Sequence, residues 1–146
     1  MKKFTFSLQS LLDIKETEEL HQINELKNIE NKLTALLEGL NKILEEISKT
    51  KRLYKEDVLK GIHANKLVQY NLFFDLLNRY LKEQKKRIAQ AEAEKEKCMK
   101  LLLGIRKEIK SLEKLYEIEL EEHKVLEKRQ REKEIDDIVT YKVAIG

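Results

Sequence analysis

The chain has 146 residues, with no proline, four glycines, no tryptophan and 39% charged residues. Its 30 Lys and Arg nearly balance 27 Asp and Glu, and both signs are interspersed, which argues against a nucleic-acid-binding protein. An apolar fraction of 41% is too high for a disordered chain. Because Glu, Lys and Leu favour helices and strand signals are absent, we expect an all-α fold with a long, thin core.

The first twelve residues share two features with a targeting segment, since Lys2 and Lys3 precede an apolar run that includes Phe4, Phe6 and Leu8. Polar residues interrupt this run and no small-residue cleavage site follows it, so we do not expect a signal peptide. No stretch approaches the roughly 18 apolar residues that a membrane span requires. We therefore expect a cytoplasmic protein without a transmembrane segment.

The first half of the chain carries a repeat with alternating steps of three and four residues, which predicts a helix over about residues 7–60. A flanking row of Ile29, Leu36 and Ile43 widens its apolar stripe. The repeat itself consists of Ile23, Leu26, Glu30, Leu33, Leu37, Leu40, Leu44, Ile47, Lys51, Tyr54 and Val58.

The second half carries the same repeat, over about residues 67–140, and here it runs with almost no interruption. A spacing of 3.5 residues keeps one narrow stripe against a partner helix, which is the pattern of a coiled coil. The single cysteine, Cys98, lies on this stripe, where we expect a buried, reduced thiol. The stripe consists of Leu67, Tyr70, Phe74, Leu77, Leu81, Gln84, Ile88, Ala91, Lys95, Cys98, Leu102, Ile105, Ile109, Leu112, Tyr116, Glu119, His123, Leu126 and Gln130.

Residues 61–66 separate the two repeats and are the best turn in the sequence, because Gly61 and Asn65 tolerate a positive φ. Two helices joined by one short turn form an antiparallel hairpin. Folding the chain at residues 63 and 64 leaves helix 2 without a partner beyond about residue 120. The prediction is a long two-helix antiparallel coiled-coil hairpin in a single domain, residues 1–146, with the second helix overhanging.

The same alignment brings Glu30 close to Lys95, the two charged residues in the middle of the stripes. We expect them to form a buried pair that fixes the register more than it adds stability. The three histidines are far apart in sequence, and no phosphate loop or nucleophile motif is present. We therefore expect no catalytic residues, no metal site, no cofactor and no enzyme activity.

Two surface features could bind partners. Leu72, Phe73, Leu76 and Tyr80 form a second apolar strip beside the stripe of helix 2, and this strip either widens the contact with helix 1 or serves as an exposed binding patch. The second feature is a basic helix end, either solvated or docked on an acidic protein surface. It consists of Lys124, Lys128, Arg129, Arg131 and Lys133.

Three stretches make the sequence similar to the FliJ family, the small coiled-coil component of the flagellar type III protein export apparatus. The first is Phe4-x-Phe6-x-Leu8-Gln9-x-Leu11-Leu12 with Lys15 where family members often have arginine. The second is Gly61-Ile62-x-x-Asn65 followed by Tyr70, Phe73, Phe74, Leu77 and Gln84. The third is Glu134-Ile135-Asp136-Asp137, similar to the family's Leu-Asp-Glu ending.

The resemblance implies a stalk-like adaptor that inserts the open end of its hairpin into the hexameric export ATPase and also contacts the cytoplasmic domain of the membrane export gate. It further implies contacts with export chaperones and a place at the inner face of the membrane at the flagellar base. Gate binding is expected at Leu72, Phe73, Leu76, Leu77, Tyr80 and Gln84. ATPase binding is expected at Phe4, Leu8, Leu12, Lys124, Lys128, Arg129, Arg131 and Lys133.

Other functions stay open at this point. The strip could hold secreted clients, which would make the protein an export chaperone or escort, and the basic end could belong to a nucleic-acid-binding arm with steep salt dependence. The sequence also resembles, more distantly, the stalk proteins of virulence type III secretion systems. Stimulation of a hexameric ATPase would distinguish an adaptor from an escort.

Overall fold

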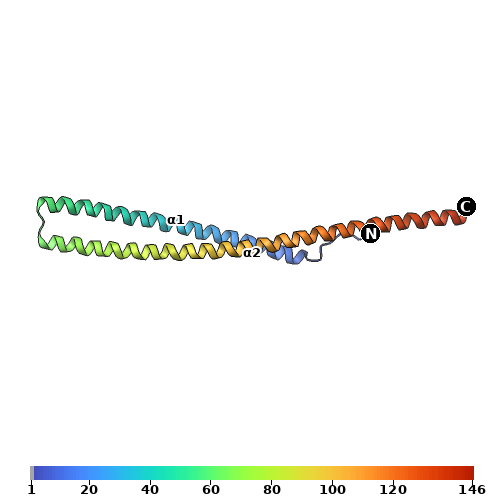
Figure 1. Cartoon of the computed structure of the whole chain (residues 1–146), viewed down its shortest axis with the longest axis horizontal. Helices are drawn as coiled ribbons and strands as arrows, with labels where there is room; N and C mark the ends of the chain where they lie inside the picture. Colours follow the sequence, from blue (N-terminus) through green and yellow to red (C-terminus); the bar gives the residue numbers. More distant parts are fainter. Residues whose placement is uncertain (1) are drawn as a thin grey trace. The chain divides into compact units, whose positions relative to one another are not determined.

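The computed structural model describes residues 2–146 and consists of two helices, α1 (Gln9–Lys60) and α2 (Ala64–Ile145), with no strand among those residues. The helices run antiparallel and pack against each other along their apolar faces (Figure 1). The predicted all-α hairpin is therefore confirmed. The helix ends differ by a few residues from the predicted ones: α1 begins at Gln9, and α2 begins at Ala64 and continues to Ile145.

The turn between the helices is shorter than predicted. Gly61 adopts a φ of 94°, a left-handed conformation that glycine alone reaches without strain, and its amide donates to the Val58 carbonyl at 3.2 Å. The His63 carbonyl then accepts the amides of Lys66 and Leu67 at 3.0 and 3.1 Å, which starts α2. Asn65 thus lies in the first turn of α2 and not in the connection.

The chain divides into two compact units, each built from antiparallel parts of both helices. The hairpin unit, Gln22–Leu101, contains the turn, and its core joins Leu33 to Ile88 and Ala91. The terminal unit combines the residues up to His21 with Leu102–Gly146. Its core consists of Phe6, Leu12, Ile109 and Leu112, with Phe4, Leu8, Ile105 and Tyr116 packed around it.

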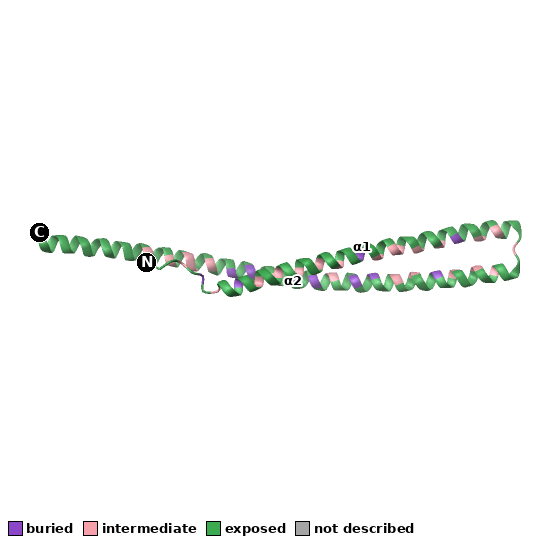
Figure 2. Ribbon diagram, turned by 180° about the vertical axis from the view of Figure 1, so that it is seen from behind, coloured by how far each residue is buried: buried purple, intermediate pink, exposed green. Residues whose placement is uncertain are grey.

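The stripe predicted for α2 faces inward. Every member from Leu67 to His123 is buried or half-buried, whereas Leu126 and Gln130 are exposed (Figure 2). In the terminal unit, all residues of α2 from Lys128 onward are exposed. This is the predicted overhang, but it begins later than the predicted position of about residue 120, because the N-terminal segment also covers α2 as far as His123.

The stripe predicted for α1 is half wrong. Its alternate members are exposed, and the row predicted only as a flank, Ile29, Leu36 and Ile43, is half-buried in their place. The reason is the cost of burying charge. The predicted row would bury the charged side chains of Glu30 and Lys51, whereas the polar residues of the observed row lie near its ends and are neutral or hydrogen-bonded. The exposed members are Ile23, Glu30, Leu37, Leu44, Lys51 and Val58, and the polar members of the observed row are Gln22, Thr50 and Asp57.

Glu30 and Lys95 lie 3.9 Å apart, but the pair is not buried, with 50% and 38% of their side chains exposed. An exposed ion pair at this distance contributes little to stability, and it therefore does little to fix the alignment of the two helices. A polar contact deeper in the hairpin unit is better placed to fix the register. Gln84 donates its side-chain amide to the Leu36 carbonyl at 2.8 Å, and Gly39 leaves the space that this side chain needs.

A cluster beside the turn holds the closed end of the hairpin unit. The Tyr70 hydroxyl donates to the Asp57 carboxylate, and Lys66 pairs with the same carboxylate at 3.1 Å. These contacts lower the pKa of Asp57, chiefly through the Tyr70 hydrogen bond. The ring of Tyr54 packs edge-on against Tyr70 and Phe74, with centroids 5.4 and 6.0 Å away.

Replacing Gly61 with alanine should destabilise the protein by about 1 kcal/mol, because a Cβ disfavours the left-handed φ although no atom obstructs it. The matched control is Gly104→Ala, a helical position where a Cβ also meets nothing. This second variant should gain up to about 1 kcal/mol of helix propensity. Urea unfolding measures both changes, and equal effects of the two variants would contradict the conformational explanation.

Candidate functional site

The apolar strip on α2 is exposed. We define the α2 strip as Leu72, Phe73, Leu76 and Tyr80, which are 64%, 38%, 40% and 54% exposed. All four side chains therefore keep accessible surface, although Phe73 and Leu76 are more than half covered. Large apolar side chains in a row on an otherwise charged helix are characteristic of a protein-binding surface.

Two residues grouped with the strip by sequence lie elsewhere. Leu77 is 5% exposed and belongs to the core stripe, and Gln84 is engaged with the α1 backbone as described above. A shallow groove of about 190 Å³ extends the strip toward the turn and is lined by Lys66, Gln69, Tyr70 and Phe73. Phe73 thus borders both the strip and the groove.

The N-terminal segment, residues 2–8, packs on the chain's own α2 in the terminal unit. The ring of Phe4 contacts Tyr116 and His123 with centroids 5.4 Å away in both cases, and Phe6 contacts Tyr116 at 5.3 Å. Of the eight residues expected to bind the ATPase, three are apolar residues near the N-terminus: Phe4 and Leu8 are half-buried here and Leu12 is only 8% exposed. Their apolar surface is largely used inside the protein.

A polar anchor holds the same segment. Ser7 donates its backbone amide to one oxygen of Glu119 at 3.1 Å and its hydroxyl to the other oxygen. These two hydrogen bonds lower the pKa of the Glu119 carboxyl below its ordinary value of 4.5. Glu119, which interrupts the apolar stripe in the sequence, is therefore the acceptor that fixes the start of the chain.

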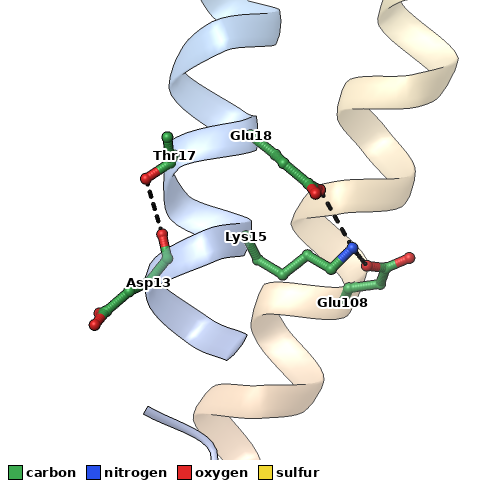
Figure 3. Close-up of polar contacts among 5 residues, drawn as sticks. All are labelled: Asp13, Lys15, Thr17, Glu18 and Glu108. Carbon is green, nitrogen blue, oxygen red and sulfur yellow. Dashed lines mark hydrogen bonds and ion pairs between the residues drawn. The ribbon is translucent and has the colours of Figure 1, made fainter. Parts of the chain in front are cut away.

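Further ion pairs join α1 and α2 within the terminal unit. Lys15 reaches Glu108 at 2.6 Å and Glu18 at 3.2 Å, so that its ammonium lies between two carboxylates (Figure 3). Both contacts raise the pKa of Lys15, with Glu108 the larger cause. Arg106 pairs with Glu19 at 3.2 Å. Each pair lies within about one helical turn of the alignment predicted from the sequence.

The basic end of α2 is fully exposed. We use this name for Lys124, Lys128, Arg129, Arg131 and Lys133, all on the helix surface. Arg131 approaches Glu127 at 3.9 Å, an intrahelical contact that holds it only weakly. Arg129 borders a groove on α2 together with Val125 and Leu126. Positive charge and apolar surface therefore occur side by side at this end.

Two kinds of feature are absent from residues 2–146. No group of three or more His, Cys, Asp or Glu side chains has an arrangement that could hold a metal ion. Neither helix, as far as the described residues extend, contains a stretch apolar and long enough to span a membrane.

The comparison with protein families decides the identity of this hairpin. Residues 4–144 match the family described as Flagellar FliJ protein. The chain belongs to the FliJ family. No curated protein and no solved structure gives a significant match. Membership makes this FliJ-family protein a component of the flagellar type III protein export apparatus.

Replacing Glu119 with glutamine should loosen the N-terminal segment, because the charged acceptor of both Ser7 hydrogen bonds is lost. Amide hydrogen exchange at Ser7 measures the change, with Glu117→Gln, on an exposed neighbouring residue, as the control. Since the folded-state pKa of Glu119 is lowered, its stabilising effect is present above pH 4.5 and is lost as the pH falls through the lower folded value. After correction for the intrinsic exchange rate at each pH, acid should therefore lower the protection of the Ser7 amide more in the wild type than in Glu119→Gln, and an identical acid response in both would contradict this anchor.

Proposed function

We propose that this FliJ-family protein is a stalk-like adaptor of the hexameric export ATPase that also binds the cytoplasmic domain of the membrane export gate. The observation that carries the proposal is the exposure of two chemically different surfaces on α2. The α2 strip belongs to the hairpin unit and the basic end belongs to the terminal unit. The chain itself covers the core stripe of α2 as far as His123, and neither surface belongs to that stripe. Both surfaces are therefore free to bind partners.

The accessible aromatic residues of the α2 strip support its role in binding the export gate. Phe73 and Tyr80 lie one heptad apart and remain accessible although the helix that carries them is paired. Aromatic side chains of this kind supply large contact area at low entropic cost and dominate binding energy in protein interfaces. The groove beside Phe73 gives a partner side chain a place to insert.

We assign ATPase binding to the basic end and give Phe4, Leu8 and Leu12 a supporting role. These apolar residues hold the start of the chain against α2, so they shape the helix end without presenting most of their surface to a partner. The basic side chains can be guided into a ring pore by electrostatic attraction, which acts mainly on the rate of association.

Alanine at both Phe73 and Tyr80 should weaken binding to the purified gate domain by about 2 kcal/mol or more, because exposed aromatic anchors are lost. Helicity and the melting temperature should change little. The matched control is Leu101→Ala with Leu103→Ala, two exposed apolar residues outside the strip. Calorimetric titration measures the affinity, and a stable variant that binds the gate normally would rule out this surface.

Reversing charge at Lys128, Arg129 and Arg131 to glutamate should abolish stimulation of the export ATPase, and raised salt should mimic the effect on the wild type. The hairpin should stay folded, since exposed substitutions change stability by only about 0.5 kcal/mol. The same reversal at Lys86, Lys97 and Lys107, all exposed, provides a control of equal charge. ATP hydrolysis is the measurement.

Two outcomes would change the assignment. A basic-end triple variant that still stimulates hydrolysis at wild-type concentration would contradict ring binding at this end. Binding of disordered secreted clients to the α2 strip without any effect on an ATPase would favour the escort function instead.

A further inference from the structure

A groove on the outer side of α2 in the terminal unit is not accounted for by the proposed adaptor function. It has a volume of about 530 Å³, and its apolar side chains Ile118, Val125 and Leu126 are 54%, 41% and 59% exposed. Glu121, Glu122 and Arg129 complete its lining. A groove of this kind along a single helix is suited to a second helix packed beside it.

Most of this face is accessible because the protein's own N-terminal segment packs on another side of α2; only Leu126, at the edge of the groove, belongs to the core stripe. Phe4 packs on Tyr116 and His123, and Val125 follows His123 by two residues, about 200° around the helix. The residues that cover the core stripe therefore leave the groove open.

The charges along this face are arranged so that the segment is complementary to itself. Glu121 and Glu122 lie one turn before Val125, and Lys128 and Arg129 lie one turn after it. In an antiparallel pair of identical helices with Val125 at the two-fold axis, each acidic turn faces the basic turn of the other copy. A parallel pair would instead place like charges side by side.

We propose that this FliJ-family protein forms a two-fold symmetric dimer through residues 114–136 of α2, with its own second copy as the occupant of the groove. Val125 packs on Val125 of the partner subunit. On one flank Glu122 pairs with Arg129 of the partner subunit, and on the other Glu121 pairs with Lys128 of the partner subunit. Lys114 meets Asp136 of the partner subunit at each end.

The charge pattern also selects this alignment over its neighbour. Moving the two-fold axis about one turn toward the N-terminal end of α2 would pair Ile118 with Val125, which buries more apolar surface. It would also place Glu121 against Glu121 of the partner subunit on one flank and Glu122 against Glu122 of the partner subunit on the other, with Arg129 near Lys114 of the partner subunit. Like charges directly opposed at a helix interface are unfavourable, so the alignment centred on Val125 is favoured.

The dimer covers Lys128 and Arg129, so dimerisation and ring binding through the basic end exclude each other. The test of the dimer contains no ATPase and no gate domain. Its result therefore stands independently of the proposed adaptor function.

The experiment is analytical ultracentrifugation of the full chain at low salt over a wide concentration range. We expect a monomer–dimer equilibrium that weakens as salt is added. Glu121→Lys with Glu122→Arg should weaken dimerisation about tenfold or more, and so should Lys128→Glu with Arg129→Glu. Combining all four substitutions should restore the dimer, because the pairs re-form with their signs exchanged.

The charge-matched control is Glu113→Lys with Glu134→Lys, two exposed residues on other sides of α2, which should leave the equilibrium unchanged. A second readout uses a Cys98→Ala background. In it, Val125→Cys should form a covalent dimer under oxidising conditions, because a residue at the two-fold axis meets its own copy. Ile138→Cys, about 140° around the helix from Val125, should not.

A protein that stays monomeric at all concentrations would overturn the proposal. So would a dimer that both double variants leave intact, since it would use another surface. Failure of the four-residue variant to restore association would overturn the antiparallel alignment centred on Val125.

Discussion

The fold depends on two helices keeping one alignment along a thin seam. The seam is so narrow that even its most buried leucines, Leu77 and Leu102, remain 5% exposed to solvent. Apolar contacts alone select an alignment poorly, because a shift of seven residues in either helix would again bring leucine and isoleucine together. Polar groups that reach across the seam must therefore supply much of the specificity.

Three such contacts are present in the hairpin unit, and each involves a position that departs from the apolar pattern. Gln84 bonds the Leu36 carbonyl, Tyr70 bonds Asp57, and the Cys98 thiol lies 3.6 Å from the Gln22 carbonyl oxygen and 3.4 Å from the side-chain oxygen of the same residue. A shift by one heptad would break all three contacts, and in either direction it would bring Gln84 opposite an isoleucine, Ile29 or Ile43. Because unsatisfied buried polar groups cost about 1–3 kcal/mol each, the alignment observed is strongly preferred.

The sequence was sufficient to predict the hairpin, the position of the turn and the inward row of α2, since in α2 one row keeps its spacing over the whole length of the helix whereas the second apolar strip is short. It was insufficient for α1, where two adjacent rows are about equally apolar. The deciding information was in the polar members: Glu30 and Lys51 of one row need water, whereas Gln22 and Asp57 of the other have partners on α2. Those partners can be identified only in the structure, where the two helices are paired.

The candidate surfaces could likewise be predicted only in part. The α2 strip could be found by its spacing, but its exposure depends on which side of α2 the partner helix occupies. The role of Phe4 and Leu8 could not be inferred, because the N-terminal segment is not helical and follows no period. Glu119, a carboxylate on an otherwise apolar stripe, suggested from the sequence only that the partner helix ends near this position; its bonds to Ser7 show that the N-terminal segment packs there instead.

The unpaired end of α2 has a consequence for the energetics of any interaction at this end. Within the described chain, the helix beyond Lys128 is supported by its own backbone hydrogen bonds without tertiary packing, and isolated helical segments of this length are only marginally stable in water. Its last turns are rich in β-branched residues, which lose side-chain freedom in a helix. The free energy of binding at these turns must therefore offset the entropy lost when they become ordered. This cost lowers the affinity for a given contact area and shortens the lifetime of the complex. The β-branched residues concerned are Ile135, Ile138, Val139, Thr140, Val143 and Ile145.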